Sequence, residues 1–448
     1  ATINDADATA ITAAELSAIG GATTGTVTVT NAVAITGSTA QVTAALVTAG
    51  TLVEVTDAAV TINDTPTIGE LNAIAAKTTG VVTATLAAAS LADLGALTTA
   101  GTDAITITVN DADAAAVTAA NLSALGGKTA GTVTVTNAVA ITGDHDQLTA
   151  ALVTAGTKVE VSDATVTVND GDATAITAAE LSAIGGSTEG QVTVTNAVAI
   201  TGTTAEVTAA LVTAGTLVVV SDAAVTITNT PTIAELNAIA AKTTGVVTAT
   251  LAANSLANLG ALNTAGTDVI TITVNDADAT AVTAADLSAL GGKTAGTVTV
   301  TNAVDVTGDH DQLTAAFVTA GTKVVVSDAT ATINDADGVA ITAAELSAIG
   351  GATTGTVTVT NAIDITGDHD QVTAALVTSG TNVAVTDATV TINDADSTAI
   401  TAAELSAIGG TTTGTVTVTN AVAITGDHDQ VTAALVTSGT KVEVTDAA

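Results

Sequence analysis

The sequence predicts a repeat solenoid, an array of parallel β coils that each carry a short helix. Three observations predict this fold. The phrase ITAAELSAIGG begins at Ile11, Ile176, Ile341 and Ile400, and the first three starts are evenly spaced. Between these phrases, short β-type segments alternate with short Ala-rich helical segments. Segments this short are not stable alone, so each must bury its apolar face against the next copy, as in a solenoid.

The repeats divide the whole chain into units of two lengths. The 59-residue units are 1–59, 107–165, 166–224, 272–330, 331–389 and 390–448, and the 47-residue units are 60–106 and 225–271. Together they account for all 448 residues, so we predict one continuous array over 1–448 without a separate catalytic domain. Each unit contains two modules, which predicts 16 coils of about 28 residues.

Each module begins with two β-type segments. Apolar and polar residues alternate in TVTVTN at 26–31 and in LVEVTD at 52–57, which is typical of half-buried strands. A bend at Asn or Asp leads to a second apolar run, such as AVAITG at 32–37. We expect these strands to stack in parallel from coil to coil, with the right-handed winding of strand–helix–strand crossovers.

A helical segment of two to three turns completes the module. Thr12 and Glu15 have the spacing of a capping box, in which each side chain accepts a hydrogen bond from the other residue's amide. The same spacing recurs at Thr177 and Glu180, Thr342 and Glu345, Thr401 and Glu404, Thr67 and Glu70, and Thr232 and Glu235. Looser versions pair Thr118 with Asn121, Thr283 with Asp286, Ser90 with Asp93, and Ser255 with Asn258.

The four histidines raise the question of a catalytic or metal site. His145, His310, His369 and His428 all lie in the phrase GDHDQ, where two carboxylates flank an imidazole. This phrase stands at the helix start of its module. The predicted N-caps are Asp144, Asp309, Asp368 and Asp427, and their partners three residues on are Gln147, Gln312, Gln371 and Gln430.

Two sibling modules favour capping as the role of this phrase. Ser38 with Gln41, and Thr203 with Glu206, occupy the same position without a histidine. Asp, Ser and Thr can replace one another as helix caps, but not as catalytic groups or metal ligands. The histidine is therefore expected to be a solvent-exposed passenger at the first helical position. A cation site shared between neighbouring coils is the alternative, and catalysis is the least favoured reading.

A second acidic motif precedes the capped helices, reading NDAD at five places and NDGD at 169–172. Stacking would align these turns into a ladder of like charge that cations screen or bridge. We favour plain solvated turns, with calcium sites as the alternative, because carboxylate oxygens suit Ca²⁺ but the EF-hand spacing is missing. The candidate calcium ligands are Asp5, Asp7, Asp111, Asp113, Asp170, Asp172, Asp276, Asp278, Asp335, Asp337, Asp394 and Asp396. No other cofactor is expected.

Threonine recurs at every second position in TVTVT at 26–30 and 132–136. A ladder of threonines on one solenoid face resembles the surface of ice-binding proteins. However, Glu54, Lys158 and Glu160 fall in the same region of other modules and would interrupt a flat surface. An ordinary solvated strand face is therefore the favoured interpretation.

Composition excludes several classes of function. The 44 acidic residues against seven Lys and no Arg give a net charge of −37, so no nucleic-acid partner is expected. The apolar runs are too short for membrane insertion. The chain has no Cys, Met, Trp or Tyr and only Phe317 as an aromatic residue, which removes thiol chemistry and aromatic platforms for sugars. A large chain without sulfur and arginine suits an extracellular or cell-surface location.

The phrase ITAAELSAIGGATTGTVTVT and its repeats resemble the long Thr-, Ala- and Asp-rich tandem arrays of secreted bacterial, particularly cyanobacterial, surface, adhesin-like or filament proteins. This resemblance implies a role in adhesion, in a surface coat or in an extracellular filament. We expect a structural repeat protein of an extracellular fibre, sheath or surface layer, and no enzymatic activity. The alternative is an adhesin stalk or passenger whose face binds a glycan, a surface or ice, with or without stabilising calcium.

The two ends of the sequence predict that the array continues. VTDAA at 444–448 followed by ATIND at 1–5 keeps the register of VTDATVTIND at 385–394 without gap or insertion. We therefore expect that either the covalent chain continues with further modules or separate chains stack head to tail. The predicted partner is thus the protein itself, with cations or surface glycans as further candidates.

Overall fold

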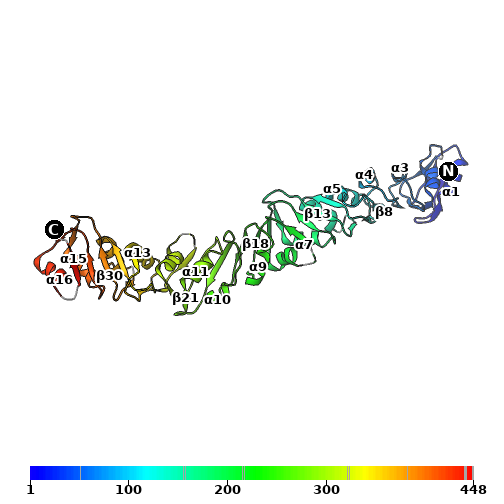
Figure 1. Cartoon of the computed structure of the whole chain (residues 1–448). Helices are drawn as coiled ribbons and strands as arrows, with labels where there is room; N and C mark the ends of the chain where they lie inside the picture. Colours follow the sequence, from blue (N-terminus) through cyan, green and yellow to red (C-terminus); the bar gives the residue numbers. More distant parts are fainter. Residues whose placement is uncertain are drawn as a thin grey trace. The chain divides into compact units, whose positions relative to one another are not determined.

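The computed structural model describes residues 1–50, 52–154, 156, 158–213, 215, 217–319, 321, 323–380, 382–437 and 441–445. Packing groups the chain into two compact units, Ala1–Thr226 with Lys242–Gly245, and Ile227–Ala241 with Val246–Ala448. Helices and strands alternate along the chain within both units (Figure 1). The predicted junction of the two chain ends includes residues 446–448, which lie outside the described residues.

The helices of the first unit are α1 (Ala13–Gly21), α2 (Thr39–Val42), α3 (Ile68–Ala75), α4 (Leu91–Leu94), α5 (Ala119–Gly126), α6 (His145–Leu148), α7 (Ala178–Gly185) and α8 (Thr204–Val207). Those of the second unit are α9 (Ile233–Ala240), α10 (Leu256–Leu259), α11 (Ala284–Gly291), α12 (His310–Leu313), α13 (Ala343–Gly351), α14 (His369–Leu376), α15 (Ala402–Gly409) and α16 (His428–Leu435). Four of them continue as a π-helical turn: η1 (Thr43–Val47), η2 (Thr149–Val153), η3 (Thr208–Val212) and η4 (Thr314–Val318). The described residues thus contain the 16 helices that 16 modules predict.

The strands are short, and the pairings between them are parallel. The first eighteen are β1 (Thr2–Ile3), β2 (Ala10–Thr12), β3 (Val27–Val29), β4 (Ala34–Gly37), β5 (Val53–Val55), β6 (Ala59–Ile62), β7 (Val82–Thr85), β8 (Ala104–Val109), β9 (Ala116–Thr118), β10 (Val133–Val135), β11 (Ala140–Gly143), β12 (Val159–Val161), β13 (Thr165–Val168), β14 (Ala175–Thr177), β15 (Val192–Val194), β16 (Ala199–Gly202), β17 (Val218–Val220) and β18 (Ala224–Ile227). The others are β19 (Val247–Thr250), β20 (Val269–Val274), β21 (Ala281–Thr283), β22 (Val298–Val300), β23 (Asp305–Gly308), β24 (Val324–Val326), β25 (Thr330–Ile333), β26 (Ala340–Thr342), β27 (Val357–Val359), β28 (Asp364–Gly367), β29 (Val383–Ala384), β30 (Thr389–Ile392), β31 (Ala399–Thr401), β32 (Val416–Val418), β33 (Ala423–Thr425) and β34 (Val442–Val444).

The strand register confirms the predicted α/β solenoid and gives the length of each turn. Ala10 of β2 pairs with Ala34 of β4, and Val27 of β3 pairs with Val53 of β5. Asp7 accepts the amide of Ala32, which lies 25 residues further on and one turn away. In the 47-residue repeat a turn is shorter, because Val82 bonds to Asp103, 21 residues further on. One turn is therefore shorter than the 28-residue average of a module.

A 59-residue repeat is longer than two turns of the solenoid, and its extra residues start a new column of stacked strands. After β12 has paired with β10, β13 pairs with both β11 and β15, and β14 begins a separate column with β16. The NDGD turn that connects β13 to β14 holds these surplus residues, and Ala173 after it adopts a left-handed conformation with φ of 59°. The acidic turns therefore lie where the chain steps from one strand column to the next.

Aliphatic side chains fill the core of every coil. Val27, Val29 and Ile35 on the strands and Leu16 on the helix are fully buried, and their counterparts recur along both units. The capping boxes are present as predicted. In α1, the Glu15 amide donates to Thr12 Oγ1 over 3.2 Å and the Thr12 amide donates to Glu15 Oε2 over 3.0 Å. Each capping box thereby satisfies two amides at a helix start, whereas α4, α5, α10 and α11, which begin with the looser pairs, have only the bond to the cap side chain.

Candidate functional site

The GDHDQ phrase caps helices, as the sequence predicts. The Gln147 amide donates to Asp144 Oδ1 over 2.8 Å, and the Asp144 amide donates to Gln147 Oε1. The same reciprocal pair forms at Asp309, Asp368 and Asp427, which begin α12, α14 and α16. The sibling modules without histidine form it with Ser38 and Thr203. Capping is thus the common role of this position in the array.

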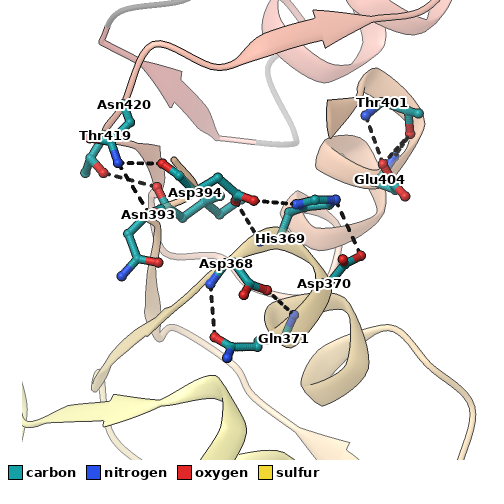
Figure 2. Close-up of polar contacts among 11 residues, drawn as sticks. Asp368, His369, Asp370, Gln371, Asn393, Asp394, Thr401, Glu404, Thr419 and Asn420 are labelled. Carbon is teal, nitrogen blue, oxygen red and sulfur yellow. Dashed lines mark hydrogen bonds and ion pairs between the residues drawn. The ribbon is translucent and has the colours of Figure 1, made fainter. Parts of the chain in front are cut away.

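The prediction that the histidine is a solvent-exposed passenger is wrong for three of the four. His369 Nδ1 lies 2.7 Å from Oδ1 of Asp394, which belongs to the NDAD turn of the next coil (Figure 2). The His369 backbone amide donates to Oδ2 of the same carboxylate over 2.8 Å. The His369 side chain is 12% exposed and the Asp394 side chain 5%. His145 with Asp170, and His310 with Asp335, repeat this arrangement.

The fourth histidine has no such partner among the described residues. His428 Nε2 lies 2.8 Å from the neighbouring Asp429, and its side chain is 89% exposed. No described residue occupies the place beside His428 that Asp394 takes beside His369. The passenger prediction therefore holds only for this histidine.

The environment of the three partly buried histidines raises their pKa. Burial alone lowers the pKa of His369, but its hydrogen bond to Asp394 and the charges of Asp394, Asp370 and Glu404 outweigh that effect. The pKa values of His145 and His310 are raised for the same reasons. The capping glutamates shift in the opposite direction: hydrogen bonds from the amide and hydroxyl of Thr401 lower the pKa of Glu404. Both shifts favour the charged form of the group.

The first aspartate of the acidic turn, or Asp64 at the same position in NDTP at 63–66, binds the preceding helix even where no histidine is present. Asp64 Oδ1 accepts hydrogen bonds from the amide and the hydroxyl of Thr39, both over 2.6 Å. Asp111 accepts the amide of Leu91, and Asp276 that of Leu256, each over 2.7 Å. In every case the acceptor binds the first amide of the helix one coil earlier, where a negative charge also favours the helix dipole. We call this contact the inter-coil tie.

The second aspartate of the turn binds the coil that follows. Asp396 Oδ1 accepts the Ala421 amide over 3.2 Å, and the Asn420 side chain donates to the Asp394 carbonyl. Asp7, Asp113, Asp172, Asp278 and Asp337 accept the amides of Ala32, Ala138, Ala197, Ala303 and Ala362 in the same way. The acidic turns are therefore bonded into the array rather than merely solvated, and Asp170, Asp335 and Asp394 are buried.

The structure locates all twelve candidate calcium ligands in these turns. Asp5 and Asp7 lie in the turn at 4–7. Among the first aspartates of the six NDAD and NDGD turns, Asp5 alone makes no inter-coil tie in the described residues. Across the described ranges, no group of three or more His, Asp or Glu side chains is placed to hold a metal ion. Calcium binding stays a prediction.

The threonines form ladders, but not continuous ones. Thr28 lies between Thr2 and Glu54, and Thr134 pairs with Glu160, so glutamate interrupts these columns as the sequence predicts. Other columns reach four threonines: Thr12, Thr36, Thr61 and Thr83; Thr118, Thr142, Thr167 and Thr193; Thr283, Thr307, Thr332 and Thr358; and Thr342, Thr366, Thr391 and Thr417. Each ladder is a single column with one threonine from each strand.

A groove of about 330 Å³ lies between α10 and α11 and contains two carboxylates and a lysine. The Lys293 ammonium donates to the Gly260 and Leu262 carbonyls, and Asp286 accepts the Thr283 hydroxyl. Asp276 ties the first amide of α10. All three charged side chains of this groove therefore have hydrogen-bond partners within the chain.

Comparisons with known proteins identify no relative: no protein-family model matches the chain, and no curated protein matches it. Within the described ranges, no helix has both the length and the apolar character that crossing a membrane requires.

The capping role can be tested at Asp144. Asp144→Ala is expected to lower the free energy of unfolding by about 1 kcal/mol, because the Gln147 amide loses its acceptor. The matched control is Asp146→Ala, two residues on, whose side chain is 88% exposed and which should cost about 0.5 kcal/mol or less. Native-state hydrogen exchange of the α6 amides in both variants measures the difference. Equal, large losses at both positions would instead indicate a shared metal site.

Proposed function

We propose that this protein is a structural repeat protein that forms part of an extracellular fibre, sheath or surface layer. One observation supports this most strongly: the groups that most resemble an active site bond one coil to the next. His369 and Asp394 bond to each other, and Asp394 also binds a helix amide. These polar groups thus hold neighbouring coils together and stabilise the array.

The charge of the chain fits a position outside the cell. A net charge of −37 keeps neighbouring arrays apart at low ionic strength and allows cations to bring them together. The absence of cysteine and methionine from the sequence leaves no sulfur to oxidise. These properties agree with the surface or filament role that the resemblance of the repeats implies.

Immunogold electron microscopy of the source cells tests this role. An antibody to the chain is expected to label a continuous layer or fibres outside the cell envelope. Label that is dispersed through the cell interior would contradict the proposal.

The alternative function is that of an adhesin stalk or passenger with a binding face. The four-threonine ladders favour it, because they present hydroxyl groups at the strand spacing of about 4.8 Å. Ice is the simplest ligand to test, since it needs no receptor. Thermal hysteresis of the purified chain, lost on replacing Thr142 and Thr167 with Lys, would support a binding face, and no hysteresis would remove ice from the candidate ligands.

Cations are expected to stabilise the acidic turns by screening their negative charges. Chelation should lower the melting temperature, and NaCl alone should restore it, because screening does not require a particular ion. Differential scanning calorimetry with EDTA, and then with added NaCl or Ca²⁺, measures this. Restoration only by micromolar Ca²⁺ would show discrete calcium sites in place of screening.

A further inference from the structure

Each histidine of an inter-coil tie has one ring nitrogen bonded inside the array and the other facing an exposed carboxylate. His369 Nδ1 lies 2.7 Å from Oδ1 of Asp394, whose side chain is 5% exposed. His369 Nε2 lies 3.4 Å from Oδ1 of Asp370, whose side chain is 87% exposed (Figure 2). The ring therefore lies between a buried carboxylate of the next coil and a solvent-facing carboxylate of its own helix.

The hydrogen bonds of the ring determine which nitrogen is free to bind a ligand. An ionised carboxylate only accepts hydrogen bonds, so Nδ1 of His369 carries the proton that it donates to Asp394. In the neutral ring Nε2 is then an acceptor, and it faces Oδ1 of Asp370, which is also an acceptor. Two acceptors attract each other only through a cation placed between them.

The spacing of these two acceptor atoms suits a transition-metal ion. Bonds of about 2.0 to 2.1 Å at a tetrahedral angle place two ligand atoms about 3.4 Å apart. The Nε2–Oδ1 separation is similar in all three ties: 3.6 Å for His145 and Asp146, 3.5 Å for His310 and Asp311, and 3.4 Å for His369 and Asp370. The bond from Nδ1 to a buried carboxylate fits the same role, because metal-bound histidines donate their other N–H to such a partner, which fixes the orientation of the ring.

The charges around the ring also favour a cation. The negative charges of Asp370, Asp394 and Glu404 all act on His369. Together they outweigh the positive end of α14, which is equivalent to about half a unit charge. A site that combines an imidazole nitrogen with a carboxylate oxygen suits Zn²⁺, Cu²⁺ or Ni²⁺, whereas Ca²⁺ and Mg²⁺ are bound by oxygen atoms.

We propose that each inter-coil tie that contains a histidine binds one divalent transition-metal ion of the Zn²⁺ class. The histidine Nε2 and the carboxylate of the next residue are the ligands, water completes the coordination, and the buried aspartate is a positioning residue that holds Nδ1. The described residues contain three such sites, at His145, His310 and His369. Two protein ligands per site agree with the finding that, over the same residues, no group of three such side chains is placed around a metal position. This inference goes beyond the proposed structural role and does not depend on it.

Because the 448-residue chain has only four histidines, NMR of the imidazole nitrogens can follow each site separately. The ¹⁵N-labelled, metal-free chain is titrated with ZnCl₂ at about pH 8 and physiological ionic strength, and single histidine-to-asparagine variants assign the signals. Zn²⁺ is expected to shift Nε2 of His145, His310 and His369 while Nδ1 keeps its proton. His428 lies beside Asp429 but has no inter-coil tie in the described residues, so it should bind Zn²⁺ about 10- to 100-fold more weakly.

Asp370→Asn tests the second ligand without changing the buried side of the tie. It is expected to weaken Zn²⁺ binding at His369 by about tenfold or more and to leave His145 and His310 unchanged. Unchanged binding at those two histidines also shows that the variant is folded. The matched control is Asp57→Asn, which removes the same charge from an exposed residue in a module without a histidine and should leave all three sites unchanged.

Three results would overturn the proposal: imidazole signals that do not respond to Zn²⁺, equal Zn²⁺ affinity at all four histidines, or an Asp370→Asn variant that binds like wild type. Equal affinity would mean that a histidine followed by an aspartate is sufficient and that the inter-coil tie has no part in binding. The test is separate from that of the structural role. Zn²⁺ binding by a chain whose label is confined to the cell interior would refute the extracellular role alone, and extracellular fibres of a chain that ignores Zn²⁺ would refute the metal sites alone.

Discussion

Asp394→Ala is expected to lower the local free energy of unfolding by about 3 kcal/mol, the largest effect of any single substitution in the acidic turns. The change removes a buried carboxylate that accepts two hydrogen bonds from His369, and it leaves the first amide of α14 unpaired. Native-state hydrogen exchange of the β28 and β30 amides measures this loss, because a repeat array opens coil by coil and a single global unfolding energy is poorly defined.

The chain provides the matched control for this substitution. Asp5 stands in an identical local sequence but is exposed and has no inter-coil tie in the described residues. Asp5→Ala should change stability by about 0.5 kcal/mol or less. Similar effects at Asp394 and Asp5 would show that the turn sequence, rather than the tie to the preceding helix, determines stability.

Raising the pH from about 6 to 8 is expected to destabilise the array, and this is the second large effect. The pKa values of His145, His310 and His369 are raised above the ordinary value of 6.5. Their contribution is therefore complete below pH 6.5 and is lost as the pH rises through the folded-state pKa. Native-state hydrogen exchange across this range should show stability falling with pH.

Two variants separate the histidines that cause this dependence. Replacing His145, His310 and His369 together with Asn should flatten the profile between pH 6 and 8, although it also lowers stability overall. His428→Asn is the matched control, because the His428 side chain is exposed and makes no inter-coil tie in the described residues. On the acid side the lowered pKa values of Glu180, Glu345 and Glu404 predict a separate loss as the pH falls through them. A profile that the triple variant does not alter would contradict the structural role of the ties.

Helix capping could be predicted from the sequence because it is a local property. A cap and its partner are three residues apart, so Thr12 with Glu15 and Asp144 with Gln147 can be recognised without knowing the tertiary structure. The alternation of Val and Thr likewise predicts half-buried strands, and the repetition predicts their parallel stacking; the structure confirms both. These features depend on neighbours in the chain and recur in every module.

The partner of the histidine could not be predicted from the average module length. His369 and Asp394 are 25 residues apart, which is the length of one turn, whereas dividing the chain by its 16 modules gives about 28. The signal was present in the sequence. His145 and His310 also precede an Asp by 25 residues, and Thr39, which replaces the histidine in its module, precedes Asp64 by 25.

The step between strand columns also required the structure. A 59-residue repeat is longer than two such turns, so the helix of the next module starts at a different place around the coil. As a result β13 continues the column of β11 while β14 begins another. Local sequence defines each strand but not the column that it joins, because that depends on the accumulated length of the preceding turns.

Cryo-electron microscopy of the native assembled material tests most directly the claim that the function of this protein is to form a continuous array. We expect filaments or layers in which coils are stacked at about 4.8 Å along a continuous array. Separate compact particles, with no filament or layer, would contradict this claim.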